Sequence, residues 1–283
     1  MISRRLFLRA LGACAGIGTG ALYYAVQVEP TWLEVVRRPL PVRRLPPALT
    51  GRTLAHLSDI HVSTLVSDEY LLDTFRRVAD SRPDVVVITG DLMSWHYGWR
   101  DHVAAIYRHV PRGRLATIAT LGNHDYGPGF GDPRMAAQVV DVLRSCGITV
   151  LRNHVLDVAG LQVVGLDDLW AEQFDPRAAL RGLDPSRAAI ALSHNPDTVD
   201  LPVWGNYEGW ILAGHTHGGQ CRPPFLPPPI LPVRNRRYTA GEFQLAGNRQ
   251  LYISRGVGHS LPVRFNVRPE VTLFELTDQH QLG

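Results

Sequence analysis

The sequence of 283 residues contains no lysine, so arginine supplies all 29 of its basic side chains. We interpret this as a bias of genomic composition rather than as a sign of function. A surface that binds nucleic acid would need basic residues clustered on the folded part of the chain. The only such cluster there consists of Arg234, Arg236 and Arg237, and we therefore expect no nucleic-acid partner.

Cysteine is also scarce, and the three residues Cys14, Cys146 and Cys221 include no CxxC pair. This spacing excludes a zinc knuckle or a dithiol redox site. Cys146 lies on the apolar side of a predicted helix, where we expect a buried thiol. Cys221 follows a histidine-rich loop closely enough to be an auxiliary metal ligand, but a metal site in this chain requires no thiolate.

Compositional extremes and internal repeats are absent as well. Hydrophobic residues make up 45% of the chain and charged residues 19%, which excludes a disordered or collagen-like protein. The length fits one large α/β domain or two small domains. One domain with two sheets and flanking helices is the simplest interpretation.

The N-terminal segment resembles a twin-arginine export signal. Ser3-Arg4-Arg5-Leu6-Phe7-Leu8 precedes a moderately apolar run from about Ala10 to Val28, which carries no charge. Paired arginines ahead of such a run are typical of these signals. A run of about 20 apolar residues can also span a bilayer, so an ordinary signal anchor is the alternative.

No Ala-x-Ala cleavage site ends this run, so we expect residues 1–28 to remain as a membrane anchor. Leu11 to Cys14 is similar to a lipoprotein box but comes too early in the chain, because the apolar run continues past it. The expected partners are therefore the membrane and the twin-arginine export machinery. The domain is expected in the cell envelope on the extracytoplasmic side, with the cytoplasmic face of the inner membrane as the alternative.

Residues 29–51 are rich in proline and arginine, which predicts an extended connector or an edge strand. The main domain is expected to comprise residues 52–283. In its first half, strand-like and helix-like patterns alternate. Strands are predicted at 53–58, 85–89 and 115–121, and helices from about 68 to before Pro83, around 103–107, and from Asp132-Pro133 to Gly147.

The second half is richer in strands. A small antiparallel group is predicted from residues 148–151, 155–158 and 161–166. Further strands are expected at 188–192, 210–213, 241–246, 250–254 and 270–276.

Five predicted strands end in residues that can bind metal ions. These residues are Asp59 with His61, Asp91, Asn123 with His124, His194, and His215 with His217. In open α/β folds, sites assemble at the carboxyl ends of strands, so these side chains can meet although they are far apart in sequence. Their nitrogen and oxygen donors suit Mn, Fe or Zn better than Ca²⁺. Taken alone, the His-x-His pair is also compatible with two buried, hydrogen-bonded histidines.

The ordered series Asp-x-His, Gly-Asp, Gly-Asn-His-Asp, His and Gly-His-x-His resembles the calcineurin-like metallophosphoesterase family. The similarity extends from about Glu29 to the C-terminus and includes Leu57 to Asp59, Gly214 to Gln220 and Gly256 to Phe265. It is greatest for bacterial members with twin-arginine or membrane-anchoring N-termini. The resemblance implies a four-layer α-β-β-α sandwich with two mixed sheets flanked by helices.

The same resemblance implies a centre of two divalent metal ions. One ion would be held by Asp59, His61, Asp91 and His217, and the other by Asp91, Asn123, His194 and His215. His124 would be a proton donor or phosphate contact, oriented by Asp125. Ile60 and Val62 stand where relatives often carry leucine, and this departure affects no ligand.

The implied activity is hydrolysis of a phosphodiester or pyrophosphate bond by a metal-bound hydroxide. Two ions about 3.5 to 4 Å apart can hold both oxygens of an in-line displacement and bring the pKa of bound water to about 7. Some relatives cleave the pyrophosphate of UDP-2,3-diacylglucosamine. A noncatalytic metal-binding envelope module and a nuclease of the same fold are the alternatives.

The proline-rich stretch Pro223 to Pro232 directly follows the expected site. It is stiff and apolar, so it could form a lip against acyl chains or the bilayer, or it could be a packed surface loop. A lipid-linked substrate such as UDP-2,3-diacylglucosamine would suit an anchored enzyme with this lip. That substrate is cytosolic, however, whereas a twin-arginine signal would place the domain outside.

Overall fold

The computed structural model describes residues 4–279. Its helices are α1 (Arg4–Tyr23), α2 (Asp68–Asp80), α3 (Trp99–Tyr107), α4 (Pro133–Ser145) and α5 (Pro176–Arg181). Short helical turns lie at Tyr24–Val28, Glu29–Thr31, Pro47–Leu49, Asn123–Tyr126, Pro196–Asp200 and His217–Gly219. The strands are β1 (Glu34–Val42), β2 (Thr53–Leu57), β3 (Val85–Thr89), β4 (Ala116–Thr120), β5 (Thr149–Val150), β6 (His154–Val158), β7 (Leu161–Gly165), β8 (Ala189–Leu192), β9 (Gly209–Ala213), β10 (Gly241–Gln244), β11 (Arg249–Ile253) and β12 (Glu270–Asp278).

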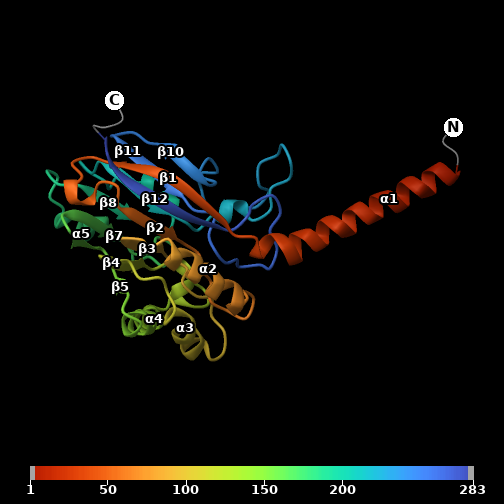
Figure 1. The fold of residues 1–283 in the computed structure, drawn as a ribbon, viewed down its shortest axis with the longest axis horizontal. Helices are drawn as coiled ribbons and strands as arrows, with labels where there is room; N and C mark the ends of the chain where they lie inside the picture. The colour runs from red at the N-terminus through yellow and green to blue at the C-terminus, as the bar shows by residue number, and fades with distance from the viewer. Residues whose placement is uncertain (1–3, 280–283) are drawn as a thin grey trace.

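The strands form two mixed sheets of six strands each, which confirms the expected α/β sandwich. Their orders are β1-β12-β2-β3-β4-β5 and β10-β11-β9-β8-β7-β6. One apolar cluster joins the two sheets, and includes Val85 and Val87 of β3 with Val163 of β7 and Ile190 of β8. Helices α2, α3 and α4 lie together beside the first sheet (Figure 1), and α5 contributes Ala179 to the cluster beyond the second sheet.

The central strands are buried over their whole length. Every residue of β3, β7, β8 and β9 is buried. Their continuous apolar runs follow from this position, because parallel strands in α/β proteins are covered on both faces. The strand ends that carry the candidate ligands are therefore held in a packed frame.

The helices beside the first sheet begin where the sequence provides caps. The Ser67 side chain accepts a hydrogen bond from the Tyr70 amide at the start of α2. The Asp132 side chain accepts hydrogen bonds from the amides of Arg134 and Met135 at the start of α4. Such side chains satisfy amides that have no partner within the helix.

Two parts of the chain refine the sequence-based expectations. Residues 34–42 form β1, an edge strand that pairs in parallel with β12. Residues 149–150 form β5, which pairs in parallel with β4 in the first sheet, so the expected three-strand antiparallel group was wrong. Only β6 and β7 of that group pair antiparallel. The reason is that α4 connects β4 to β5 as a crossover, and crossovers join parallel strands.

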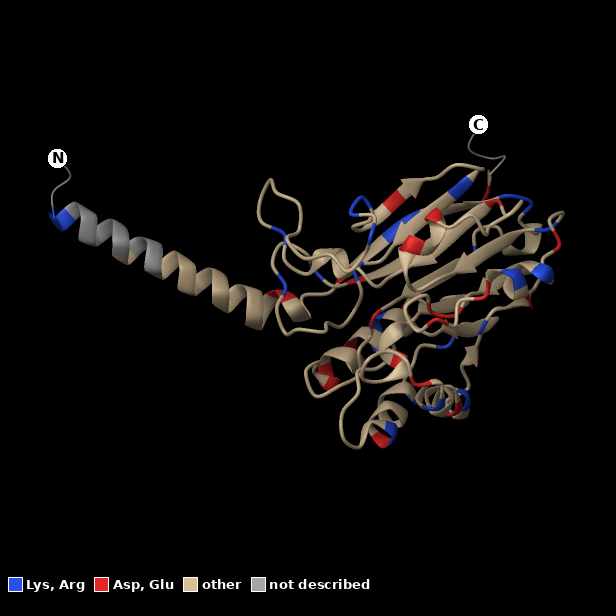
Figure 2. Cartoon of the chain, turned by 180° about the vertical axis from the view of Figure 1, so that it is seen from behind, with Lys and Arg blue, Asp and Glu red and all other residues tan. Residues whose placement is uncertain are grey.

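Helix α1 projects away from the packed body (Figure 1). From Gly16 to Val28 this segment carries no charged residue, as Figure 2 shows. Within residues 4–279, no helix is both long enough and apolar enough to cross a membrane.

Candidate dimetal centre

The predicted site residues meet at the carboxyl ends of strands from both sheets. Asp59 and His61 follow β2, Asp91 follows β3, Asn123 and His124 follow β4, His194 follows β8, and His215 and His217 follow β9. All of the predicted ligands are buried, and His124 is half-buried. The first three strands belong to one sheet and the last two to the other, so the centre lies across the edges of both sheets.

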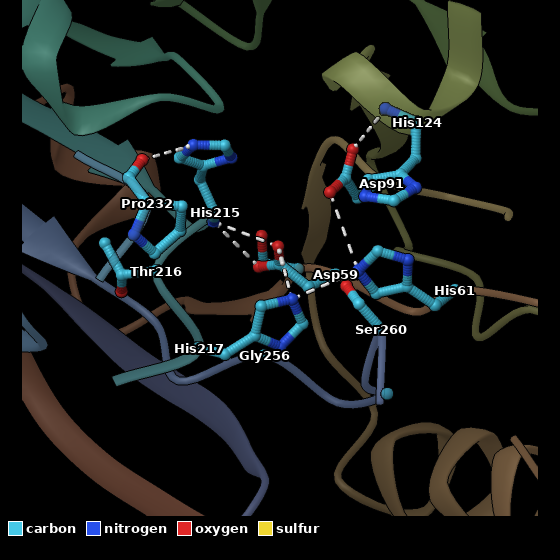
Figure 3. A network of polar contacts seen from close by, with 12 residues as sticks. Asp59, His61, Asp91, His124, His215, Thr216, His217, Pro232, Gly256 and Ser260 are labelled. Atoms are coloured by element: carbon cyan, nitrogen blue, oxygen red, sulfur yellow. Dashed lines mark hydrogen bonds and ion pairs between the residues drawn. The ribbon is translucent and has the colours of Figure 1, made fainter. Parts of the chain in front are cut away.

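The site contains two groups of potential ligands. The Nε2 atom of His61 lies 3.1 Å from that of His217, and His217 Nε2 lies 3.5 Å from Asp59 Oδ1 (Figure 3). In the second group, His194 Nε2 lies 3.2 Å from His215 Nδ1. The two groups share Asp91, because its Oδ2 lies 3.5 Å from His61 Nε2 and 3.3 Å from His194 Nε2.

Hydrogen bonds to backbone carbonyls show which ring nitrogens are available. His194 Nδ1 lies 2.8 Å from the Thr89 carbonyl, and His215 Nε2 lies 2.8 Å from the Pro232 carbonyl. A carbonyl oxygen only accepts, so each of these nitrogens carries the proton. In the neutral form of each ring, His194 Nε2 and His215 Nδ1 therefore carry the free lone pair that a metal ligand requires.

The buried environment keeps several histidines neutral. Burial lowers the pKa of His215 to about 3, and it lowers the pKa of His61 and His217 well below the usual range. His194 differs: burial acts to lower its pKa, but the charge of Asp91, the hydrogen bond to it and the charges of Asp59 and Asp168 together outweigh burial and raise the pKa well above the ordinary value. Neutral imidazoles are the form that binds metals.

The carboxylates also fit a cationic centre. Burial raises the pKa of Asp59 to about 7. Burial also acts to raise the pKa of Asp91, but the charges of His194 and His124 outweigh it and bring that pKa well below its usual range. Buried charges need partners. The Oδ1 atom of Asn123 is buried and has no hydrogen-bond partner among the described residues, which leaves a free oxygen donor in the second group.

Left-handed backbone is concentrated at the ligands. Asp59, His61, Asp91, His215 and His217 all have φ between 49° and 70°. Such a conformation costs about 1 to 3 kcal/mol for a residue other than glycine and persists only where the surroundings enforce it. The side chain of Asp59, for example, accepts hydrogen bonds from the His215 amide at 2.9 and 3.1 Å. No sequence signal predicted this strain.

Two glycines permit the close approach of these loops. A Cβ atom at Gly90, which has φ of 78°, would lie 2.6 Å from His194 Nδ1. A Cβ atom at Gly214 would lie 2.2 Å from Asp59 Oδ2. Any side chain at either position would displace a candidate ligand.

His124 and Asp125 have different environments. The His124 ring packs edge-on against His61, with centroids 4.8 Å apart, and its amide donates to Asp91 Oδ1 at 2.9 Å. Asp125 is fully buried, and its carboxylate accepts hydrogen bonds from the amides of Leu92, Met93 and Gly122. None of these bonds reaches the His124 ring, so Asp125 fixes the two strand-end loops and orients His124 through the backbone.

The sequence did not reveal the groups around the ligands. His61 Nδ1 lies 2.8 Å from Ser94 Oγ. The Thr89 and Pro232 carbonyls hold His194 and His215 as described above, and backbone carbonyls carry no residue-type signal. Arg264 is fully buried, with Nη2 3.4 Å from His217 Nδ1, and burial lowers its pKa to about 10.

A cavity of about 310 Å³ opens from the centre and is largely apolar. Its polar floor includes Asp91, Asn123, His124, His215 and His217. Its apolar wall consists of Phe130, Trp170, Pro229, Ile230, Pro232, Leu261 and Val263.

This combination of two mixed sheets and a histidine and carboxylate centre at their strand ends defines a metal-dependent phosphoesterase. A family model described as calcineurin-like phosphoesterase matches residues 52–219, and the chain belongs to this family. The protein is thus a hydrolase of phosphoric ester bonds that uses a dimetal centre, and the two groups described above are the candidate ligands of that centre.

Three relatives illustrate the range of this similarity. The chain is 34% identical to phosphodiesterase YaeI of Escherichia coli K12, covering 98% of this chain and 100% of the relative. It is 33% identical to the uncharacterized metallophosphoesterase YkuE of Bacillus subtilis, covering 97% and 98%. It is 26% identical to UDP-2,3-diacylglucosamine pyrophosphatase LpxG of Chlamydia trachomatis, covering 88% and 91%.

Proposed function

We propose that the protein hydrolyses a phosphodiester or pyrophosphate bond in an amphipathic, lipid-linked substrate. The observation that carries this proposal is the single cavity shared by the candidate ligands and an apolar wall. A phosphoester group would lie over the polar floor while an acyl chain contacts the wall. Ligand sites of this type combine apolar walls with a few polar groups that fix orientation.

The ligands divide between two divalent ions in this proposal. Asp59, His61 and His217 would hold one ion, the second group of Asn123, His194 and His215 would hold the other, and Asp91 would contribute to both. When bound, the ions supply charge neutralisation for the phosphoryl oxygens and lower the pKa of a water molecule. Mn, Fe and Zn all suit these donors.

His124 is the proposed proton donor to the leaving oxygen. It borders the cavity, and its amide is held by Asp91, so the ring stands beside the bridging carboxylate. A positioned histidine of this kind accelerates proton transfer. Asp125 acts on the same residue by fixing the turn that carries it.

Aromatic side chains extend from His124 across the mouth of the site. Phe130 lies 4.9 Å from the His124 ring by centroid, Trp170 lies 6.1 Å from Phe130, and Trp170 lies 4.5 Å from His215. This chain of rings offers a stiff apolar surface directly beside the reacting group. The similarity to LpxG, whose name specifies a nucleotide-linked diacyl sugar, supports this type of substrate.

The test compares three substrates on metal-loaded protein: a chromogenic phosphodiester, a chromogenic monoester and UDP-2,3-diacylglucosamine. We expect the highest kcat/KM for the acylated pyrophosphate and the lowest for the monoester. The His124→Ala variant is the control for contaminating hydrolases. Equal kcat/KM for acylated and unacylated substrates would contradict the lipid-linked assignment but not the phosphoesterase activity.

For the location, we propose the cell envelope, with the N-terminal segment attached to the membrane and the domain outside the cytoplasm. Paired Arg4 and Arg5 ahead of an uncharged segment support export by the twin-arginine machinery. Phe225, Leu226 and Ile230 expose apolar side chains on the loop beside the cavity, which supports contact with lipid. A C-terminal compartment reporter tests this, and reporter activity confined to the cytosol would contradict it.

A further inference from the structure

Arg264 belongs to the segment Gly256 to Phe265. The proposed mechanism assigns no role to this segment. Its guanidinium is fully buried, and no ion pair to a carboxylate is found for it within residues 4–279. Its two Nη atoms are instead directed at main-chain carbonyl oxygens, those of Val267, Arg255, Gly256 and Gly258, while its buried Nε has no hydrogen-bond partner among the described residues. Burial of a guanidinium is costly unless its donors form hydrogen bonds. The bonds from the Nη atoms therefore hold the surrounding loop in place.

The loop that Arg264 holds packs directly against the first ligand turn. The Val257 amide donates to the Ser58 carbonyl at 2.9 Å, and the Gly258 amide donates to the Asp59 carbonyl at 2.7 Å. A Cβ atom at Gly256 would lie 2.8 Å from Asp59 Cβ and 3.2 Å from His217 Nδ1. These contacts therefore help to fix the left-handed backbone conformation of Asp59.

Arg264 also lies beside a candidate ligand. Its Nη2 atom is 3.4 Å from His217 Nδ1, on the side of the ring opposite the Nε2 atom that faces His61. A guanidinium only donates, and a metal-binding Nε2 leaves the ring proton on Nδ1, so this is a packing contact and Arg264 acts through the loop that it holds against Asp59. Its contacts thus concern Asp59 and His217, which belong to one ligand group. None of its hydrogen bonds named above involves Asn123, His194 or His215.

The N-terminal segment is hydrogen-bonded to the backbone of the segment that carries Arg264. The amide of Arg264 donates to the Ala25 carbonyl at 2.8 Å. The carboxylate of Glu29 is fully buried and accepts hydrogen bonds from the amides of Asn266 at 2.8 Å and Val267 at 2.5 Å. Residues 25–29 are therefore fastened to the segment that carries Arg264, although they precede the family-matched region by more than 20 positions.

We propose that Arg264 is a positioning residue for the metal ion held by Asp59, His61 and His217, and that Glu29 couples the N-terminal segment to that half of the centre. The proposal rests on the proposed dimetal function, because it concerns the same ligands. It assigns to the N-terminal segment a role in the site in addition to membrane attachment.

The test measures metal affinity of the full-length protein rather than turnover. Apo protein is titrated with Mn²⁺ by calorimetry and with Co²⁺ by visible absorption, for Arg264→Lys and Glu29→Gln. The matched control is Arg268→Lys, because the Arg268 side chain also donates to the N-terminal segment, at the Trp32 and Leu33 carbonyls, and has no hydrogen bond to residues 256–258 in the part of the chain that the structure describes. Each variant is repeated in a His194→Ala background and in a His217→Ala background, which damage the second and the first group respectively.

For Arg264→Lys in the His194→Ala background, we expect a loss of about 10- to 100-fold in affinity and an altered Co²⁺ spectrum, the range typical of outer-shell partners. Glu29→Gln should weaken binding in the same direction but less. Neither variant should change affinity in the His217→Ala background. Unlike a substrate assay, these readouts do not depend on whether a lipid-linked phosphoester is cleaved.

Three results would overturn the proposal. Folded Arg264→Lys with unchanged affinity would exclude positioning, and equal losses in both backgrounds would indicate only a general effect on stability. Failure of both Arg264→Lys and Glu29→Gln to fold, with Arg268→Lys folded, would assign the arginine to folding rather than to the metal centre.

Discussion

The floor and the wall of the cavity are built in opposite ways. On the floor, the candidate ligands follow buried strands and are fixed by hydrogen bonds and by left-handed backbone. On the wall, Ile230 and Leu261 come from irregular loops and leave much of their side chains exposed. The proposed function accordingly assigns the reaction to the floor and substrate selection to the wall.

Among the substitutions considered, removal of the shared Asp91 carboxylate from the floor should reduce metal binding and hydrolysis most. In Asp91→Ala, we expect loss of both ions and of measurable hydrolysis, because Asp91 Oδ2 faces both ligand groups. The metal affinity should fall by more than the roughly 10- to 100-fold expected for an outer-shell change. Elemental analysis after dialysis gives the occupancy, and full occupancy would exclude a bridging role.

His124→Ala should separate chemistry from metal binding. We expect kcat to fall by about 10² to 10⁴, the contribution of a positioned general acid, while the metal content stays at the wild-type value. Stopped assays on a chromogenic diester, together with elemental analysis, measure both quantities. Unchanged turnover would remove His124 from the mechanism.

Substitutions in the apolar wall should raise the KM for acylated substrates only. Leu261→Ser and Ile230→Ser each remove an apolar side chain from the cavity. If an acyl chain buries that side chain, each loss is worth about 1.5 to 3 kcal/mol, or roughly 10- to 150-fold in kcat/KM. Hydrolysis of a small chromogenic diester should be unchanged.

Phe225→Ser provides the matched control for Ile230→Ser, because Phe225 is exposed on the same loop as Ile230 but does not line the cavity. It should leave KM unchanged in a detergent-solubilised assay. An equal effect of Phe225→Ser and Ile230→Ser would mean that loop hydrophobicity in general, rather than the cavity wall, governs substrate binding.

A substitution far from both the floor and the wall of the cavity should have the smallest effect. Asp132→Ala removes the side-chain cap of α4, which should reduce the free energy of unfolding by about 1 kcal/mol. Urea denaturation measures this change, and kcat/KM should remain at the wild-type value. A change in kcat/KM would show that α4 influences the neighbouring His124 turn.

The convergence of the floor residues could be predicted from sequence, and so could an apolar stretch beside the site, Pro223 to Pro232. The way in which the wall is assembled could not. Asp59, Asp91, Asn123, His194 and His215 each follow a short apolar run, and parallel strands bring their carboxyl ends together. The wall instead depends on a contact between distant loops, where Cys221 pairs with Phe265 and the Arg222 amide donates to the Phe265 carbonyl at 2.8 Å. No local pattern encodes that contact.

The same limit applies to the fold. Strands and helices with strong periodicity, such as β3 and α2, lie where the sequence predicts them. The partner of the two-residue strand β5 was missed because so short a strand carries no pairing signal of its own. The role of Arg264 also could not be predicted from the sequence, because its partners are backbone carbonyls.

The most direct test of the two-ion account is the number of divalent ions bound per chain, measured by elemental analysis of reconstituted wild type and of His194→Ala. We predict two ions per chain in the wild type, as in-line displacement between paired metals requires, and one in His194→Ala. A single ion in the wild type, or an unchanged count in the variant, would contradict the account.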